Sequence, residues 1–143
     1  MALPNGAGGY QLGDGNLLEP VLGYLDAPLT ETGTTAVTLT AEEVTNGILI
    51  ANPGTTGTTY TMPIVVTAGG VTGINDIVSS AKVGSTFSWT IVNIGTTTGD
   101  ITLAAGTGTG WTIVGALVID NETSASFVAR KTSDTTWTLY RTA

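Results

Sequence analysis

The sequence predicts an all-β protein: an antiparallel β-sandwich or jelly-roll-like domain preceded by an extended N-terminal arm. Gly and Thr are abundant and only 10% of the 143 residues are charged, which suits short strands and tight turns. From about Thr35 onward, apolar and polar side chains alternate with a period of two, as in half-buried strands. Before that point Gly and Pro interrupt the apolar residues too often for a helix. We therefore expect an arm over residues 1–34 and a β-domain over residues 35–143.

The arm begins MALPNGAGGYQLGDGNLLEPVLGYLDAP and carries nine large apolar side chains: Leu3, Tyr10, Leu12, Leu17, Leu18, Val21, Leu22, Tyr24 and Leu25. Their burial would contribute roughly 14–27 kcal/mol, against about 1–2 kcal/mol of backbone entropy for each of some thirty ordered residues. Apolar burial alone therefore does not suffice to order the whole arm. We expect it to bind a surface supplied by another chain, helped by pairing with a strand edge. The alternative is that it packs on its own β-domain as an extra edge strand or lies disordered.

Alternation predicts the strands of the β-domain and their inward faces. In TFSWTIVN, the side chains of Phe87, Trp89 and Ile91 would face one side and those of Thr86, Ser88 and Thr90 the other. The same pattern occurs in AVTL (Val37, Leu39), DITL (Ile101, Leu103), SASFVAR (Ala125, Phe127, Ala129) and TTWTLY (Trp137, Leu139). GILIANP and WTIVGALVI are nearly apolar on both faces, so both faces need cover. That cover is either the protein's own second sheet or loops, or a neighbouring subunit.

The connections are predicted to be turns and two short helices. Thr40 to Glu43 has the spacing of a capping box, and Asn46-Gly47 would end this helical turn. Within residues 67–82, AGGVTG is typical of a loop and INDIVSSAK could form a second helix. GDG at 13–15 and GTGTG at 106–110 lack the spacing of a phosphate-binding loop and no Lys follows in place, so turns are expected there.

Residue types restrict the chemistry. The chain has no Cys and no His, which removes thiolate nucleophiles, the commonest general base and the commonest metal ligand. Asp120 and Glu122 could suggest a calcium site or a glycosidase pair, but DNET between two strands is typical of a hairpin turn. We expect no enzymatic activity, no catalytic residue, no cofactor and no metal.

Charge and hydropathy exclude two classes of partner. The formal net charge is −7 and all four basic residues lie beyond residue 81, so no cationic cluster is available for nucleic acid. No apolar run approaches the length needed to cross a bilayer, and the start lacks the features of a signal peptide. We expect no nucleic-acid partner, no membrane partner and no export by the ordinary route.

Three segments together resemble a β-module found in structural proteins of tailed bacteriophages, among them capsid decoration (cement) proteins and head or tail fibres. They are GILIANPGTTGTTYTMP, STFSWTIVNIGTTTGDITLAAGTGTGWTIVG and SASFVARKTSDTTWTLYR, and the likeness spans roughly residues 35–142. The resemblance implies a small β-sandwich or jelly-roll-like domain that forms a homotrimer and binds the outside of a phage head. The segment TAGGVTGINDIVSSAKVG departs from the module because it has more Gly and Asn than the helical connection there.

By this resemblance the function is adhesion. The protein would be made in the host cytoplasm and act on the outer capsid surface of the virion, where the apolar arm residues would contact the major capsid protein. Trimerisation would strengthen weak arm contacts by raising their effective concentration. The alternative is a receptor- or glycan-binding module of a phage fibre, in which Tyr60, Trp111 and Trp137 would stack on sugars if exposed, although Trp137 alternates in phase with Leu139 and so favours the core. A carboxylate hydrolase built on Asp120 and Glu122 is the third hypothesis.

Overall fold

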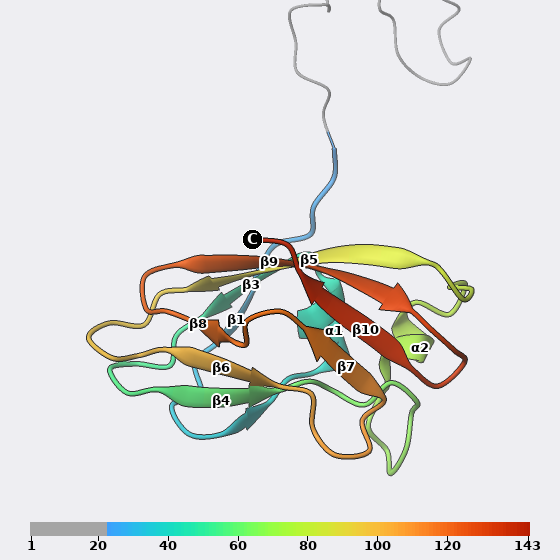
Figure 1. Ribbon diagram of the computed structural model, residues 1–143, viewed down its shortest axis with the longest axis horizontal. Helices are drawn as coiled ribbons and strands as arrows, with labels where there is room; N and C mark the ends of the chain where they lie inside the picture. The colour runs from blue at the N-terminus through green and yellow to red at the C-terminus, as the bar shows by residue number, and fades with distance from the viewer. Residues whose placement is uncertain (1–22) are drawn as a thin grey trace, which may run out of the picture.

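A computed structural model describes residues 23–143, which form two mixed β-sheets and two short helices (Figure 1). Sheet A has six strands, in the order β1 (Leu29–Glu31), β3 (Ile48–Ala51), β5 (Thr86–Asn93), β9 (Ser124–Lys131), β10 (Trp137–Arg141) and β7 (Trp111–Val114). Sheet B has four, in the order β2 (Val37–Thr38), β4 (Thr58–Thr61), β6 (Ile101–Ala104) and β8 (Val118–Ile119). The helices are α1 (Ala41–Thr45) and α2 (Ile74–Ile77). The prediction of a mostly β protein is confirmed.

The chain alternates between the two sheets from β1 to β9, with odd-numbered strands in sheet A and even-numbered strands in sheet B. The first three strands of each sheet, in chain order, run the same way: β1, β3 and β5 are parallel, and so are β2, β4 and β6. Antiparallel pairing joins β5 to β9, β9 to β10 and β6 to β8. With β7 parallel to β10, five of the eight strand pairs are parallel, so the predicted antiparallel arrangement is wrong.

Three loops rich in Gly and Thr carry the chain from sheet A to sheet B and stack on one another. They span residues 32–36, 52–57 and 94–100, and each contains Gly-Thr-Thr. The amide of Thr96 donates to the carbonyl of Gly54 (2.9 Å), and the hydroxyl of Thr58 donates to the carbonyl of Thr34 (3.1 Å). Each Gly-Thr-Thr therefore marks one of the stacked loops that lead from a parallel strand of sheet A to a parallel strand of sheet B.

A hydrophobic core of twenty buried residues joins the two sheets, and strand alternation predicted ten of them correctly. The predicted inward residues that are buried are Leu39, Trp89, Ile91, Ile101, Leu103, Ala125, Phe127, Ala129, Trp137 and Leu139. Val37 and Phe87 are half-buried and pack against this core.

The three tryptophans of sheet A fix other segments against it. Each indole N–H donates a hydrogen bond to a group outside the sheet: Trp89 Nε1 to the Glu43 carbonyl in α1 (3.0 Å), Trp111 Nε1 to the Pro63 carbonyl (2.8 Å) and Trp137 Nε1 to Asn75 Oδ1 in α2 (3.0 Å). A buried indole N–H is costly without an acceptor. These bonds therefore position both helices and the loop after β4.

Both short helices that the sequence predicted are present. In α1 the amide of Glu43 donates to Thr40 Oγ1 (3.2 Å) and the amide of Thr40 donates to Glu43 Oε2 (2.7 Å), which is the capping box. Gly47, at φ +91°, takes the left-handed conformation after the helix ends. Within residues 23–143, neither helix has the length or apolar character needed to cross a membrane.

Tyr60 makes the stability of the fold sensitive to alkaline pH. Its side chain is buried and its hydroxyl donates to the Gly33 carbonyl (3.3 Å). Burial, with smaller contributions from the charges of Glu31 and Glu43, raises the pKa of Tyr60 to about 12. In the unfolded chain the tyrosine ionises near pH 10, so the stability it contributes is complete below about pH 10 and is lost as the pH rises toward about 12.

We expect the free energy of unfolding, measured by urea titration, to fall between about pH 10 and about pH 12. The fall should be smaller in Tyr60→Phe, which has no hydroxyl to ionise. An equal fall in the two proteins would contradict this assignment.

Candidate functional site

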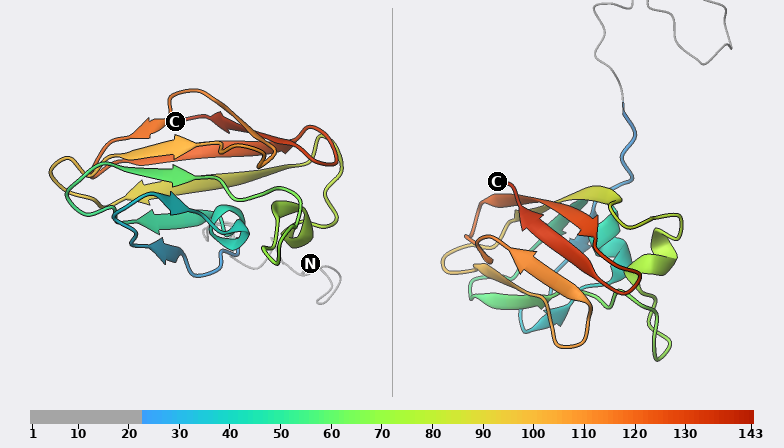
Figure 2. Two further views of the ribbon diagram at one scale, coloured as in Figure 1. Left: turned by 90° about the horizontal axis from the view of Figure 1, so that it is seen from below. Right: turned by 45° about the vertical axis from the view of Figure 1, so that its right-hand side comes forward.

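The described end of the predicted arm is exposed. Of the nine apolar residues predicted to bind another chain, Tyr24 and Leu25 are described, and their side chains are 90% and 51% exposed. Residues 23–28 approach the body from the side opposite sheet B, as Figure 1 and the right panel of Figure 2 show. The remaining seven lie outside the described residues: Leu3, Tyr10, Leu12, Leu17, Leu18, Val21 and Leu22.

The chain is attached to the domain from Leu25 onward. A Cβ atom on Gly47 would lie only 2.8 Å from Leu25 Cδ1, so this leucine lies against the backbone after α1. Asn46 Nδ2 donates to the Ala27 carbonyl (2.9 Å), and β1 then pairs in parallel with β3. Residues 29–31 thus form an edge strand of sheet A inside the range predicted as arm, while Tyr24 is free of the domain surface.

A groove of about 620 Å³ lies beside the attached segment. Tyr24, Leu25 and Leu29 line one part of it, and Ile77 and Val78 at the end of α2 line another. Leu29 and Ile77 are 37% and 40% exposed, so the groove offers apolar contact surface.

The charged groups that line the groove are carboxylates. They belong to Asp26 and Glu42, and among residues 23–143 no Lys or Arg lines the groove. The hydroxyl of Tyr24 donates to Asp26 Oδ1 (2.8 Å), and this hydrogen bond, with the negative charge of Asp26, raises the pKa of Tyr24. A segment that combines apolar and basic side chains would suit the groove.

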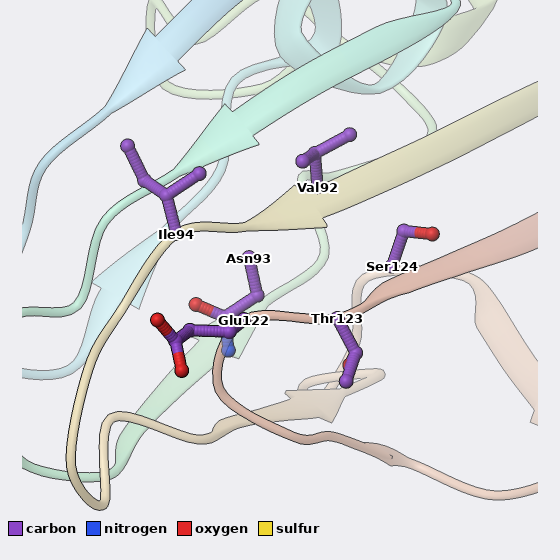
Figure 3. Close-up of a pocket in the computed structure, with 6 residues that line it drawn as sticks. All are labelled: Val92, Asn93, Ile94, Glu122, Thr123 and Ser124. Atoms are coloured by element: carbon purple, nitrogen blue, oxygen red, sulfur yellow. The ribbon is translucent and has the colours of Figure 1, made fainter.

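A second pocket, of about 440 Å³, lies where β5 ends and β9 begins. In Figure 3 the side chains of Val92 and Ile94 point to one side of β5 and that of Asn93 to the other. Asn93 is buried, and its amide is fully occupied by the protein's own loops. Its Nδ2 lies within hydrogen-bonding distance of the carbonyls of Gly99 (2.9 Å), Ile119 (3.1 Å) and Asp120 (3.1 Å), and its Oδ1 accepts from the Gly95 amide (2.8 Å). The asparagine therefore has a structural role and is not free to bind a ligand.

The Asp120 to Thr123 turn is not a hairpin, because it leads from β8 in sheet B to β9 in sheet A. That part of the prediction is wrong: alternation identified two strands without showing that they belong to different sheets. Glu122 is exposed and takes a positive φ of 57° in this turn. In the part of the chain that the structure describes, no group of three or more carboxylates is placed to hold a metal ion.

The three aromatic residues considered for sugar stacking are buried. Tyr60, Trp111 and Trp137 are 0%, 7% and 1% exposed, so none presents a ring face to solvent. GTGTG at 106–110 is a turn between β6 and β7, as predicted.

The two segments that are apolar on both faces differ in their cover. Ile48 and Ile50 of β3 are half-buried by the protein itself. In the other segment Val114, Leu117 and Val118 are 48%, 41% and 45% exposed. These exposed residues are surface that the sequence did not identify as such, although the two-faced apolar run was the signal for it.

Exposed apolar side chains of the described residues lie beside the arm, around β7 and β8, and at Val66, Val71, Val83 and Ile94. The buried amide of Asn93 serves the fold. A scan against protein-family models matches no family, and searches of curated proteins and of solved structures find no match for this chain.

Proposed function

We propose that this protein is a structural virion protein that binds the outer surface of a phage head as a homotrimer and stabilises or decorates the capsid. Its N-terminal arm docks on the major capsid protein, and its two mixed sheets form the β-sandwich or jelly-roll-like body that carries the arm. The proposal assigns it no enzymatic activity. The observation that carries it is the exposure of the described end of the arm: the side chain of Tyr24 is 90% exposed.

The energetics of the exposed end favour docking on another chain. Burying a large apolar side chain on a partner contributes roughly 1.5–3 kcal/mol. Tyr24 is almost wholly available for such burial and Leu25 is available in part, because their side chains are 90% and 51% exposed. In a trimer, docking of one arm raises the effective concentration of the other two, so modest contacts give lasting attachment.

Charge indicates the chemistry of the receiving surface. Asp26 and Glu42 lie at the base of the arm, and the first 81 residues contain no Lys or Arg. A capsid surface that receives this end should therefore present apolar side chains together with Lys or Arg. The glycan-binding alternative is disfavoured because its three aromatic residues are buried.

Removing residues 2–24 tests the proposal. The truncated chain keeps Leu25, the hydrogen bond from Asn46 to Ala27 and strand β1, so we expect it to fold. Its affinity for phage heads that lack this protein, measured by co-sedimentation, should fall by at least about tenfold, which corresponds to about 1.4 kcal/mol of lost contact.

The control is Val66→Ser, which removes an exposed apolar side chain in the loop between β4 and α2 and should bind as the full-length protein does. Unchanged binding of the truncated chain would remove adhesion from the arm. Absence of the protein from purified virions would overturn the whole proposal.

A further inference from the structure

The side of sheet A that faces away from the core carries fifteen side chains, which the strand register arranges in four rows. The rows are Thr86, Arg130, Thr138 and Thr112; Ser88, Val128, Tyr140 and Val114; Ile48, Thr90 and Ser126; and Thr30, Ile50, Val92 and Ser124. None of them is buried, whereas their sequence neighbours Trp89, Phe127 and Leu139 lie in the core. We name this surface the outer face.

The outer face contains no carboxylate. Eight of its residues are Ser or Thr and five are Val or Ile, and the other two are Tyr140 and Arg130. The whole chain has eleven acidic and four basic residues. The outer face thus carries one cationic side chain and no anionic one.

We propose that the outer face is the surface through which copies of this chain associate. The inference rests on the homotrimer of the proposed function and names its contact. Each copy carries a net charge of −7, so copies repel one another wherever they bring carboxylates together. The outer face is the part of sheet A where two copies meet without that repulsion.

The chemistry of the outer face is also self-complementary. A Ser or Thr hydroxyl both donates and accepts hydrogen bonds, so hydroxyls on one part of the outer face can pair with hydroxyls on another part of a neighbouring copy's outer face. A three-fold assembly needs this, because each copy meets its two neighbours through two different parts of its surface. Val114 and Tyr140, 48% and 37% exposed, add apolar contact at one margin of the face.

The position of the arm agrees with this contact. In Figure 1, residues 23–28 lie on the side of sheet A that faces away from sheet B, which is the side of the outer face. Association through the outer face would therefore bring the arms of neighbouring copies together, as docking by several arms requires.

The test is the mass of the purified full-length protein in solution, measured by light scattering. Wild-type protein should have three times the 14.5 kDa mass of one chain. Ser88→Glu in β5 and Thr112→Glu in β7 each place a carboxylate at an exposed position of the outer face. Both variants should be monomeric at concentrations at which the wild-type protein is a trimer.

The matched control is Thr102→Glu, which adds the same charge at an exposed position of β6 in sheet B and should stay trimeric. Ser88→Ala, which adds no charge, should also stay trimeric, and circular dichroism should show every variant folded. Trimeric Ser88→Glu and Thr112→Glu proteins, or a monomeric wild-type protein, would overturn the inference. The two proposals can fail separately. If the wild-type protein is a trimer and Ser88→Glu dissociates it, the outer face is supported as the contact between copies. If that wild-type trimer does not bind phage heads, the capsid role is overturned.

Discussion

Replacing Trp137 by alanine is expected to lower the free energy of unfolding by about 3–5 kcal/mol, the range for removing a large aromatic side chain from a packed core. Trp137 is 1% exposed, and its ring centroid lies 5.3 Å from that of Phe87 and 6.2 Å from that of Trp111. The substitution removes these contacts and leaves Asn75 Oδ1 without the indole N–H that it accepts. Urea or guanidinium denaturation measures the loss.

Trp137→Phe is the matched control. It keeps an aromatic ring in the core and removes the indole N–H, so we expect a smaller loss, of about 1–2 kcal/mol. A loss below about 1 kcal/mol for Trp137→Ala would contradict the packing of the aromatic row between β5, β10 and β7.

Alternation predicted the parts of the fold that depend on local physics. A strand with one covered face must alternate, and β5, β6, β9 and β10 do so over the residues that the sequence indicated. The capping box of α1 is local as well, since Thr40 and Glu43 satisfy each other's backbone amides.

Strand pairing was not predictable in the same way. Alternation is identical for a strand whose neighbour runs parallel and for one whose neighbour runs antiparallel. The direction of pairing depends on whether a turn returns the chain to the same sheet or leads it to the other one. The turn from Asp120 to Thr123 leads to the other sheet, and only the repeated Gly-Thr-Thr of the stacked loops gave a sequence signal for this winding.

The candidate site was predictable only in part, for the same reason. The apolar composition of the arm indicated Tyr24 and Leu25, and both are exposed. The outer face could not be found from the sequence, because Ser88 and Thr112 belong to one surface only through the order of strands β5, β9, β10 and β7. Separate strands each show ordinary polar positions, and their shared lack of carboxylates appears only when the sheet is assembled.

Asn93→Ala is expected to lower the free energy of unfolding by about 3 kcal/mol, because each buried polar group left without a partner costs about 1–3 kcal/mol. The Asn93 side chain is 1% exposed and joins the end of β5 to two loops. Its Nδ2 serves the carbonyls of Gly99, Ile119 and Asp120, and its Oδ1 accepts from the Gly95 amide. Denaturation with urea at neutral pH measures the effect.

Asn93→Asp separates the donor from the acceptor role of this side chain. The carboxylate can still accept from the Gly95 amide, but it faces the three carbonyl oxygens that Nδ2 serves. Burial and these oxygens should raise the pKa of the introduced carboxyl above its unfolded value of about 3.9. The destabilisation should then be complete at about pH 7 and decrease as the pH falls toward about 4, because protonation removes the buried charge and supplies a donor.

Asn52→Asp is the control for this experiment because the two asparagines share one local motif. Asn52 Oδ1 accepts from the Gly54 amide (3.1 Å), as Asn93 Oδ1 does from Gly95, but Asn52 is only half-buried and precedes the stacked loop at 52–57. An Asp keeps that acceptor, so Asn52→Asp should change the free energy of unfolding by no more than about 0.5 kcal/mol and show little dependence on pH. Equal effects at the two positions would mean that Asn93 stabilises the fold only through the hydrogen bond that its Oδ1 accepts from the Gly95 amide. A large, pH-dependent effect at Asn93 only would show that its Nδ2 holds the loops of the two sheets together.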